Sequence, residues 1–535
     1  MTKHLLRTLI AVALAASATL TGSLASAADS HTFRWSYQGD VNSLDPMVLS
    51  ESFTLGFQFA FYEPLVAYDE DLNLTPALAV SWENPEPTKW VFHLREGVKF
   101  HDGSPFSADD VIFSWQRSLS PNSQLKGYTG IITDVRKIDA HTVEMTTAEP
   151  APILPRNLVL VYMMSKTWAQ QHDTMEAASV TGDDNYANLH ENGTGPFVVT
   201  ERQPDIRTVL SRFDDYWDDQ LPTNVDRVVF QPIKQESTRV AALLSGDMDL
   251  VQPIPVQDWP RLENTAGIEL LRRPETRALF IGFDQFRDEL LYSNVKGKNP
   301  FKDRRVREAV ARAIDAELID KKIMRGAGAA LGTIIAPSVN GWDPAFARPY
   351  AQDVEQAKKL LAQAGYPDGF KVTLDCPNDR YVNDEKICEA VVTMLARIGI
   401  DVDLLAQTKS KFFGKVLLTG GNDTSMYLFG WAPITVDAEN ALTYLVACRD
   451  SKTGAGQSNL GHYCNPEIDA LIAKIRVETD QAQRNALIKQ ALLLLRQDFA
   501  YIPLVQPPLS WGVREGIAVQ QRADSFLDMR HVVLP

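Results

Sequence analysis

The sequence predicts an α/β protein that folds into more than one lobe. Its 535 residues exceed the size of one ordinary domain, so two or three lobes are expected. In the second half of the chain, strand, loop, helix and strand patterns follow one another, which is typical of a mainly parallel sheet. Apolar residues make up 45% and charged residues 23% of the chain, a composition that supplies large hydrophobic cores.

The N-terminus has the pattern of a secretory signal peptide. Lys3 and Arg7 give a basic start, residues 9–20 are largely apolar, and Ala-Ser-Ala follows at 25–27. The apolar stretch is too short for a membrane span and is interrupted by polar residues. We therefore expect cleavage after residue 27. Because no cysteine lies near that point, we expect a protein that is not lipid-anchored and is free in an oxidising compartment.

Two strands and a helix are predicted early in the mature chain. In residues 32–37 the apolar side chains Phe33 and Trp35 alternate with polar ones. In residues 90–94 large apolar side chains likewise recur at every second position, which is typical of half-buried strands. Ser107 followed by Asp110 resembles a capping box, which predicts that a helix begins there.

The second half alternates helices with strands. Helical stripes are centred on Val310, Leu361, Val391 and Leu492, and the second of these is expected to stop at Gly365. Strands are expected at the ranges 370–374, 400–404, 427–431 and 501–505. In such lobes ligands bind at the carboxyl ends of strands, so the loop 377–384 and the region after residue 431 are of interest.

Four cysteines fit an oxidising compartment. We expect Cys376 to pair with Cys388 and Cys448 with Cys464, because these pairings close short loops between sequence neighbours. A zinc site is the alternative, but the spacings do not match paired zinc ligands and no histidine cluster joins them.

The charge and the remaining motifs exclude other classes. The formal net charge of −15 argues against a nucleic-acid partner, which needs a basic face. The nine histidines show no paired ligand spacing, so we expect no metal site and no cofactor. No nucleophile elbow and no zinc-protease helix is present, so an enzyme is not expected.

A series of motifs in a fixed order resembles one family. They are Leu-Ala-Val-Ser-Trp at 78–82, Trp-Val-Phe-His-Leu-Arg-Glu-Gly-Val-Lys-Phe-His-Asp-Gly at 90–103, Gly-Thr-Gly-Pro-Phe at 193–197, Ser-Gly-Asp-Met-Asp at 245–249, Phe-Lys-Asp-Arg-Arg-Val-Arg at 301–307, Ala-Gly-Tyr-Pro-Asp-Gly-Phe at 364–370 and Asn-Pro-Glu-Ile-Asp at 465–469. Together they resemble the extracellular solute-binding proteins of family 5, which serve the oligopeptide, dipeptide, opine and nickel ABC importers. The resemblance covers nearly all of the mature chain.

The resemblance implies a two-lobe periplasmic binding protein of type II, in the large cluster with an inserted subdomain and a ligand cleft between the lobes. The expected division is a signal peptide at 1–27, lobe I at 28–71, 195–280 and 505–535, the inserted subdomain at 72–194, and lobe II at 281–504. A hinge motion closes such lobes on the ligand. The implied partners are a small solute or short peptide and the permease with its ATPase, and the protein is expected to be a monomer.

The resemblance also indicates where a ligand is held. Dipeptide receptors of the family carry an Asp after a Gly-Trp pair that binds the peptide ammonium, and here that position is Ile434, after Gly430-Trp431. A buried ammonium without a carboxylate is costly, so the standard pose for a free peptide is in question. Asp437 is the substitute we consider; its alternative role is to cap the next helix.

Four further residues complete the predicted site. Related receptors place an Arg from the loop after a strand on the ligand carboxylate, and Arg380 lies near that position. Tyr381 and Trp431 are candidates to stack on the ligand, and Tyr37 ends the first strand where the cleft opens. A solvated loop charge for Arg380 and a core position for Trp431 are the structural alternatives.

A peptide or peptide-like solute is the first functional hypothesis. An opine-like conjugate or a metal chelate is the second, since a chelate needs no protein ligands. A secreted hydrolase and a periplasmic chaperone are the remaining hypotheses.

Overall fold

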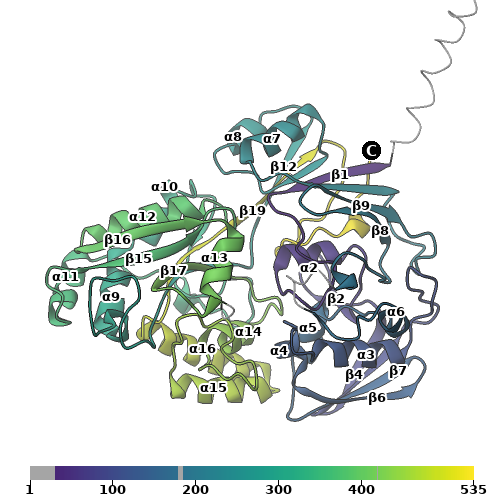
Figure 1. Cartoon of the computed structure of the whole chain (residues 1–535), viewed down its shortest axis with the longest axis horizontal. Helices are drawn as coiled ribbons and strands as arrows, with labels where there is room; N and C mark the ends of the chain where they lie inside the picture. The colour runs from purple at the N-terminus through teal and green to yellow at the C-terminus, as the bar shows by residue number, and fades with distance from the viewer. Residues whose placement is uncertain (1–30, 179–184, 418–419) are drawn as a thin grey trace, which may run out of the picture.

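The computed structural model describes residues 31–178, 185–417 and 420–535. The predicted signal peptide lies outside these ranges. Figure 1 shows three parts: a sheet with helices on the left, a second sheet at the upper right, and a smaller sheet below it. None of the helices in the described ranges combines the length and the apolar character that a bilayer crossing requires.

A seven-stranded sheet forms the part that contains the start of the mature chain. Its order is β12-β19-β11-β1-β10-β9-β8. The predicted first strand is confirmed as β1 (Thr32–Tyr37), which lies parallel to both of its neighbours. Trp35 is buried against Phe57 and Phe230. The other strands are β8 (Phe197–Gln203), β9 (Arg207–Arg212), β10 (Arg227–Pro232), β11 (Leu250–Gln252), β12 (Ile268–Pro274) and β19 (Pro508–Arg514). We call this part lobe I.

A six-stranded sheet forms lobe II, in the order β14-β18-β13-β17-β15-β16. Its strands are β13 (Ala278–Phe283), β14 (Ala329–Ala330), β15 (Phe370–Pro377), β16 (Ile400–Gln407), β17 (Met426–Trp431) and β18 (Ile502–Gln506). Its longer helices are α9 (Arg304–Ala313), α11 (Val354–Gln363), α12 (Asp384–Ala396), α15 (Pro466–Val477) and α16 (Gln481–Gln497). The predicted strands and helices of this half are confirmed, including the helix stop at Gly365, which has φ 93°.

The sheet of lobe II is mixed, so the expectation of a mainly parallel sheet is wrong. β15 lies parallel to β16 and β17, whereas β13, β14 and β18 make antiparallel pairs. The parallel pair β15 and β16 is joined by helix α12, as the local pattern predicts. β13 and β18 are the strands that connect to lobe I, so their direction depends on where the chain crosses rather than on a local strand–helix–strand unit.

A four-stranded antiparallel sheet forms the third part, in the order β4-β5-β7-β6. Its strands are β4 (Ala79–Glu86), β5 (Lys89–Leu94), β6 (Ile132–Asp139) and β7 (Thr142–Thr147), and helix α3 (Ala108–Ser118) packs on it. The predicted capping box is confirmed, because the Ser107 hydroxyl accepts from a backbone N–H at the start of α3 and Asp110 accepts from the Ser107 N–H.

The chain crosses between lobes I and II at two neighbouring places. Residues 275–277 join β12 to β13, and Pro507 joins β18 to β19. The Glu275 N–H donates to the Pro507 carbonyl (3.2 Å), and the Gln506 side chain donates to the Glu275 carbonyl (2.6 Å). The predicted lobe boundaries at 280/281 and 504/505 fall inside β13 and β18.

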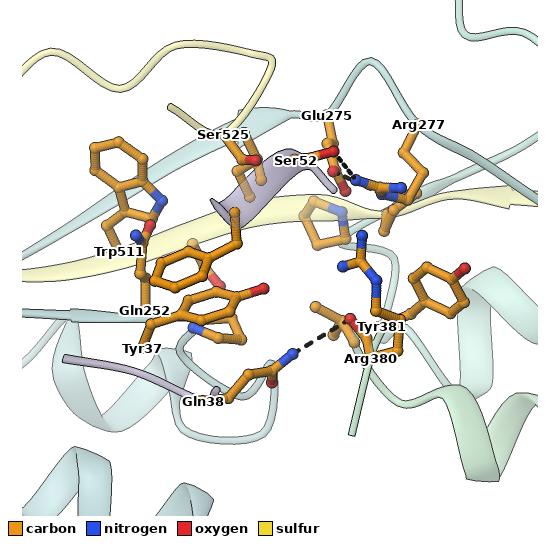
Figure 2. A pocket seen from close by; sticks show the side chains of 17 residues that line it. Tyr37, Gln38, Ser52, Gln252, Glu275, Arg277, Arg380, Tyr381, Trp511 and Ser525 are labelled. Atoms are coloured by element: carbon orange, nitrogen blue, oxygen red, sulfur yellow. Dashed lines mark hydrogen bonds and ion pairs between the residues drawn. The ribbon is translucent and has the colours of Figure 1, made fainter. Parts of the chain in front are cut away.

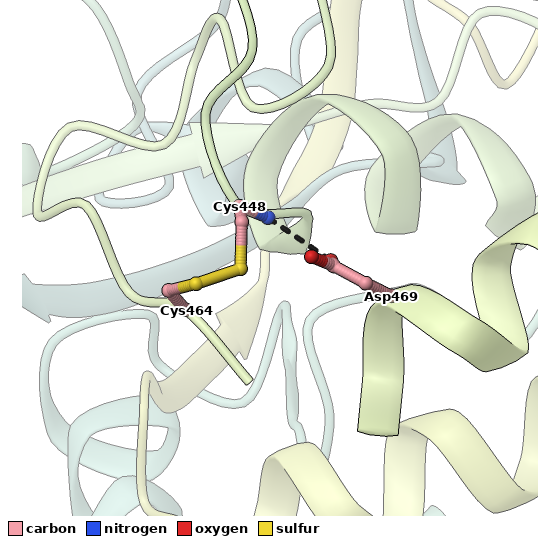
Figure 3. Close-up of side chains that lie close together, drawn as sticks. All are labelled: Cys448, Cys464 and Asp469. Atoms are coloured by element: carbon pink, nitrogen blue, oxygen red, sulfur yellow. Dashed lines mark hydrogen bonds between the residues drawn. A yellow bond between two sulfur atoms is a disulfide. The ribbon is translucent and has the colours of Figure 1, made fainter. Parts of the chain in front are cut away.

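Both predicted disulfides are present in lobe II. Cys376 is bonded to Cys388, and Cys448 to Cys464. The sulfurs of Cys448 and Cys464 lie beside Asp469, whose carboxylate accepts a hydrogen bond from the Cys448 N–H (3.0 Å; Figure 3). Because these sulfurs are joined to each other, they are not thiolate ligands, and the zinc alternative is not supported.

A buried ion pair fastens the inserted subdomain to lobe I. Arg117 of α3 donates to both oxygens of Asp45 (2.7 and 2.5 Å), and neither side chain is exposed. The guanidinium also donates to the Thr174 carbonyl (2.9 Å). Each of these two buried charges is stabilised by the other, because removing one leaves the other buried without an opposite charge.

The variant Asp45→Asn should therefore lower the free energy of unfolding by about 3–5 kcal/mol, since it leaves a buried guanidinium unpaired. Urea unfolding followed by tryptophan fluorescence measures this. Asp109→Asn is the matched control, because Asp109 forms an exposed ion pair with Lys137 that contributes at most about 1 kcal/mol. Equal losses in the two variants would contradict the role assigned to Arg117 and Asp45.

Candidate ligand-binding site

A cavity lies where the two lobes meet the two connecting segments (Figure 2). The end of β1, the start of helix α2 (Ser52–Gln58), residues 275–277, the segment 507–511 and the loop after β15 all line it. The empty space between these side chains is about 590 Å³, part of it open to solvent. Side chains of both lobes therefore face one small volume, so a molecule held there would contact both lobes at once.

Three of the predicted residues meet in this cavity: Tyr37, Arg380 and Tyr381. Tyr37 stacks on Phe53 of α2, with ring centroids 3.8 Å apart and planes 9° from parallel. The Tyr381 hydroxyl accepts a hydrogen bond from the Gly430 N–H (2.9 Å), which fixes that ring at the end of β17. Figure 2 shows the Arg380 side chain between the two tyrosines. The aromatic rings thus form the walls around one guanidinium.

Arg380 makes an ion pair across the lobes. Its guanidinium lies 3.4 Å from the carboxylate of Glu51, and the two side chains are only 9% and 10% exposed. Gln38 of lobe I also donates to the Arg380 carbonyl (3.2 Å). Burial alone would raise the pKa of Glu51, but the nearby cations Lys409 and Arg380 and hydrogen bonds from Thr54 hold that pKa at about 2. Glu51 is therefore ionised at neutral pH.

A second charged pair belongs to the connecting segment itself. Arg277 donates to Glu275 (2.7 Å) and to the Ser52 hydroxyl (3.3 Å), and both charged side chains are nearly buried. Sequence reasoning missed Glu51, Glu275 and Arg277. For Glu275 and Arg277 a signal was present, because they come just before the uninterrupted apolar run of β13, and a charged side chain beside a buried strand needs a partner.

Trp431 and Asp437 lie outside this cavity. The Trp431 indole N–H donates to Asn440 (2.9 Å), and its ring packs near Phe429. Asp437 caps helix α14 (Ala438–Ala441) and accepts from the Arg484 guanidinium through both oxygens (2.7 and 2.8 Å). Both carboxylate oxygens of Asp437 are thus engaged within lobe II, and the residue takes the capping role rather than facing the cavity.

Ile434 lies in an apolar crevice between the lobes. The crevice is lined by Phe59, Tyr68, Tyr162 and Phe526 of the lobe I side. Its one carboxylate among the described residues, Asp524, accepts from the Arg522 guanidinium (2.5 and 3.2 Å). The place where a peptide ammonium is expected from the resemblance thus contains rings and a carboxylate that is already bound.

Comparisons with known proteins identify the family. The profile of the bacterial extracellular solute-binding proteins, family 5 (middle), matches residues 73–453. The chain belongs to this family. Heme-binding protein A of Haemophilus influenzae is 28% identical over 499 residues, covering 87% of this chain and 86% of that protein. The glutathione-binding protein of Pectobacterium atrosepticum is 29% identical, covering 84% and 83%.

Solved structures agree with this assignment. The periplasmic binding protein DppA of Helicobacter pylori, in complex with the peptide STSA, superposes with a TM-score of 0.82 at 25% identity, covering 94% of this chain and 98% of its own. The binding protein AgaA from A. tumefaciens R10, in complex with agropinic acid, gives 0.81 at 25% identity, covering 94% and 99%. The predicted family and two-lobe fold are confirmed, and the family consists of binding proteins.

Asp384 positions the loop that carries Arg380 and Tyr381. Its carboxylate, at the start of α12, accepts from the backbone N–H groups of both residues (2.9 Å each). Burial raises the pKa of Asp384 to about 7, although these hydrogen bonds oppose the rise. A carboxyl whose folded-state pKa is raised stabilises the fold fully below its unfolded pKa and loses that contribution as the pH rises through the folded value.

The free energy of unfolding should therefore fall by about 3 kcal/mol between pH 5 and pH 8 relative to the variant Asp384→Asn, which does not titrate. Urea unfolding of both proteins at several pH values measures the difference. The difference should change most steeply between about pH 5 and pH 6, midway between the unfolded and folded pKa values, and level off above about pH 7. A parallel pH dependence of the two proteins would contradict the raised pKa of Asp384.

Proposed function

We propose that this protein is the periplasmic receptor of an ABC importer and captures a small peptide-like solute between its two lobes. The cavity beside the connecting segments carries the proposal, because it places the buried Arg380 where side chains of both lobes face the same volume. Relatives whose names or structures refer to glutathione and to a peptide support a peptide-like solute.

The cavity is lined by residues of both lobes, which gives a reason for the lobes to close on a solute. Tyr37 and Ser52 come from lobe I, whereas Arg380 and Tyr381 come from lobe II. A solute that touches both sets contacts the closed state better than the open one, and only such a difference shifts the equilibrium toward closure. The closed shape is then what the permease recognises.

The location and partners belong to the same proposal. Residues 1–27 act as a cleaved signal peptide, and the mature protein is a free periplasmic monomer that delivers its solute to a permease with an associated ATPase. The net charge of −15 and the family support a small-molecule partner rather than a nucleic acid. The family likewise supports binding without catalysis.

An opine-like conjugate is the second candidate. The apolar surroundings of Ile434 do not suit a free peptide ammonium, and a related receptor holds agropinic acid. A metal chelate is the third, because a chelate brings its own ligands to the metal.

A thermal-shift screen tests the proposal. The full-length mature protein is unfolded and refolded to remove bound solute, then exposed to free and N-acetylated di- to tetrapeptides, opine-like conjugates and metal–histidine complexes. A ligand at about 100 times its dissociation constant stabilises the fold by about 2.7 kcal/mol. We expect the peptides to remain uncleaved after incubation with the protein for hours. Failure of every solute to bind would contradict the proposed function.

Arg380→Gln should weaken binding of the carboxylate solute found in the screen by about tenfold or more, because a charged hydrogen bond in a buried site is lost. Isothermal titration calorimetry measures the change. Arg136→Gln is the control, since Arg136 is 58% exposed on the inserted subdomain. If Arg380→Gln and the wild-type protein bound the solute with equal affinity, Arg380 would not be a ligand-binding residue.

A further inference from the structure

The ion pair between Glu51 and Arg380 leaves a donor and an acceptor unused. The Arg380 Nε and the Glu51 Oε1 are both buried and have no hydrogen-bond partner among the described residues. The other Glu51 oxygen accepts from the Thr54 N–H and hydroxyl (3.0 Å each). The 3.4 Å separation of the charged groups is longer than a good charge-assisted hydrogen bond. Unmade hydrogen bonds of buried charged groups are costly, so a molecule that completes them gains affinity.

The other acidic side chains around the cleft are already bound. Each is held by an arginine with at least one contact of 2.7 Å or less: Glu275 by Arg277, Asp437 by Arg484 and Asp524 by Arg522. Among these four acidic side chains, Glu51 is the one with a buried carboxylate oxygen that accepts no hydrogen bond from the described residues.

We propose that the site recognises a zwitterionic head group, in which one carbon carries both an ammonium and a carboxylate. The carboxylate binds Arg380 at Nε, the ammonium binds Glu51 at Oε1, and together they replace the direct ion pair between the lobes. This inference rests on the proposed function and names the class of solute.

Because the charges of Arg380 and Glu51 lie close together, a ligand that binds both must carry its two charges at the same end of the molecule. With 3.4 Å between the guanidinium and the carboxylate, a simple anion that reaches Arg380 also meets Glu51 and is repelled. A simple cation at Glu51 meets Arg380 and the nearby Lys409. A peptide that carries its ammonium at the far end, by Ile434, meets apolar rings there and a carboxylate, Asp524, that Arg522 already holds. Only a head group with adjacent opposite charges satisfies both protein groups at once.

Two isomeric dipeptides test this directly. γ-Glutamyl-alanine carries an ammonium and a carboxylate on one carbon, whereas α-glutamyl-alanine has the same atoms and net charge but an amide carbonyl beside its ammonium. The wild-type protein, refolded without solute, should bind the γ isomer at least about tenfold more tightly in calorimetry. N-acetyl-γ-glutamyl-alanine, which lacks the ammonium, should bind about as weakly as the α isomer.

Glu51→Gln should remove the preference for the γ isomer and should bind the N-acetylated compound more tightly than the wild-type protein does, because the repelling carboxylate is gone. This gain of affinity cannot come from a folding defect. Glu86→Gln, at an exposed ion pair with Lys89, is the control and should keep the preference. Binding of peptide-like solutes with no γ preference, or with the preference intact in Glu51→Gln, would overturn the inference and leave the proposed function standing. Absence of binding by every peptide-like solute would overturn both.

Discussion

The two segments that connect the lobes run side by side, and the position of the candidate binding cavity follows from this constraint. Residues 275–277 and Pro507 are joined by backbone and side-chain hydrogen bonds, so the lobes have one common axis about which to move. The cavity lies against these segments. Arg277 and Glu275 belong to one of these connecting segments, whereas Arg380 and Glu51 come from different lobes, so the hinge motion that we propose separates the second pair and leaves the first together.

Buried charges in this protein fall into two groups with different geometry. Three pairs, which lie within one lobe or fasten the inserted subdomain, have contacts of 2.7 Å or less and make at least two hydrogen bonds each, which offsets the cost of burying them. The pair between the lobes is longer and leaves hydrogen-bonding atoms unused. The short pairs are Arg117 with Asp45, Arg484 with Asp437, and Arg530 with Asp528. Geometry thus separates these three pairs from the pair between Glu51 and Arg380, which under the proposed function breaks when solute enters.

Periodicity in the sequence predicts the local elements well, because strands and helices bury their faces at fixed spacings. β1, the capping box at Ser107 and the helix stop at Gly365 are all set by neighbours in the chain. The mixed character of the lobe II sheet is not set by neighbours in the chain. The directions of β13 and β18 depend on segments more than 200 residues apart that meet only in the folded protein.

The same distinction applies to the site. Tyr37, Arg380 and Tyr381 line one cavity, and their contact with a ligand stays a prediction. Asp437 does not join them, because Arg484, forty-seven residues further along the chain, takes its carboxylate. Glu51 carries no local signal, since an acidic residue before a helix is an ordinary cap. Its role in the cleft depends on Arg380, which lies far along the chain in the other lobe.

The long contact and unused hydrogen-bonding atoms of the Glu51–Arg380 pair also bear on how the proposed receptor would distinguish its loaded state from its empty state. A strong direct pair would close the lobes without solute, and the permease would then meet an empty receptor as often as a loaded one. The pair observed is long enough to add little to closure by itself, since opening returns both charges to water. A solute that completes both hydrogen bonds contacts both lobes only when they are closed. Its binding therefore stabilises the closed state and not the open one. Because a shift from mostly open to mostly closed needs a difference of about 5.5 kcal/mol between the two states, two completed charged hydrogen bonds supply a large share of it.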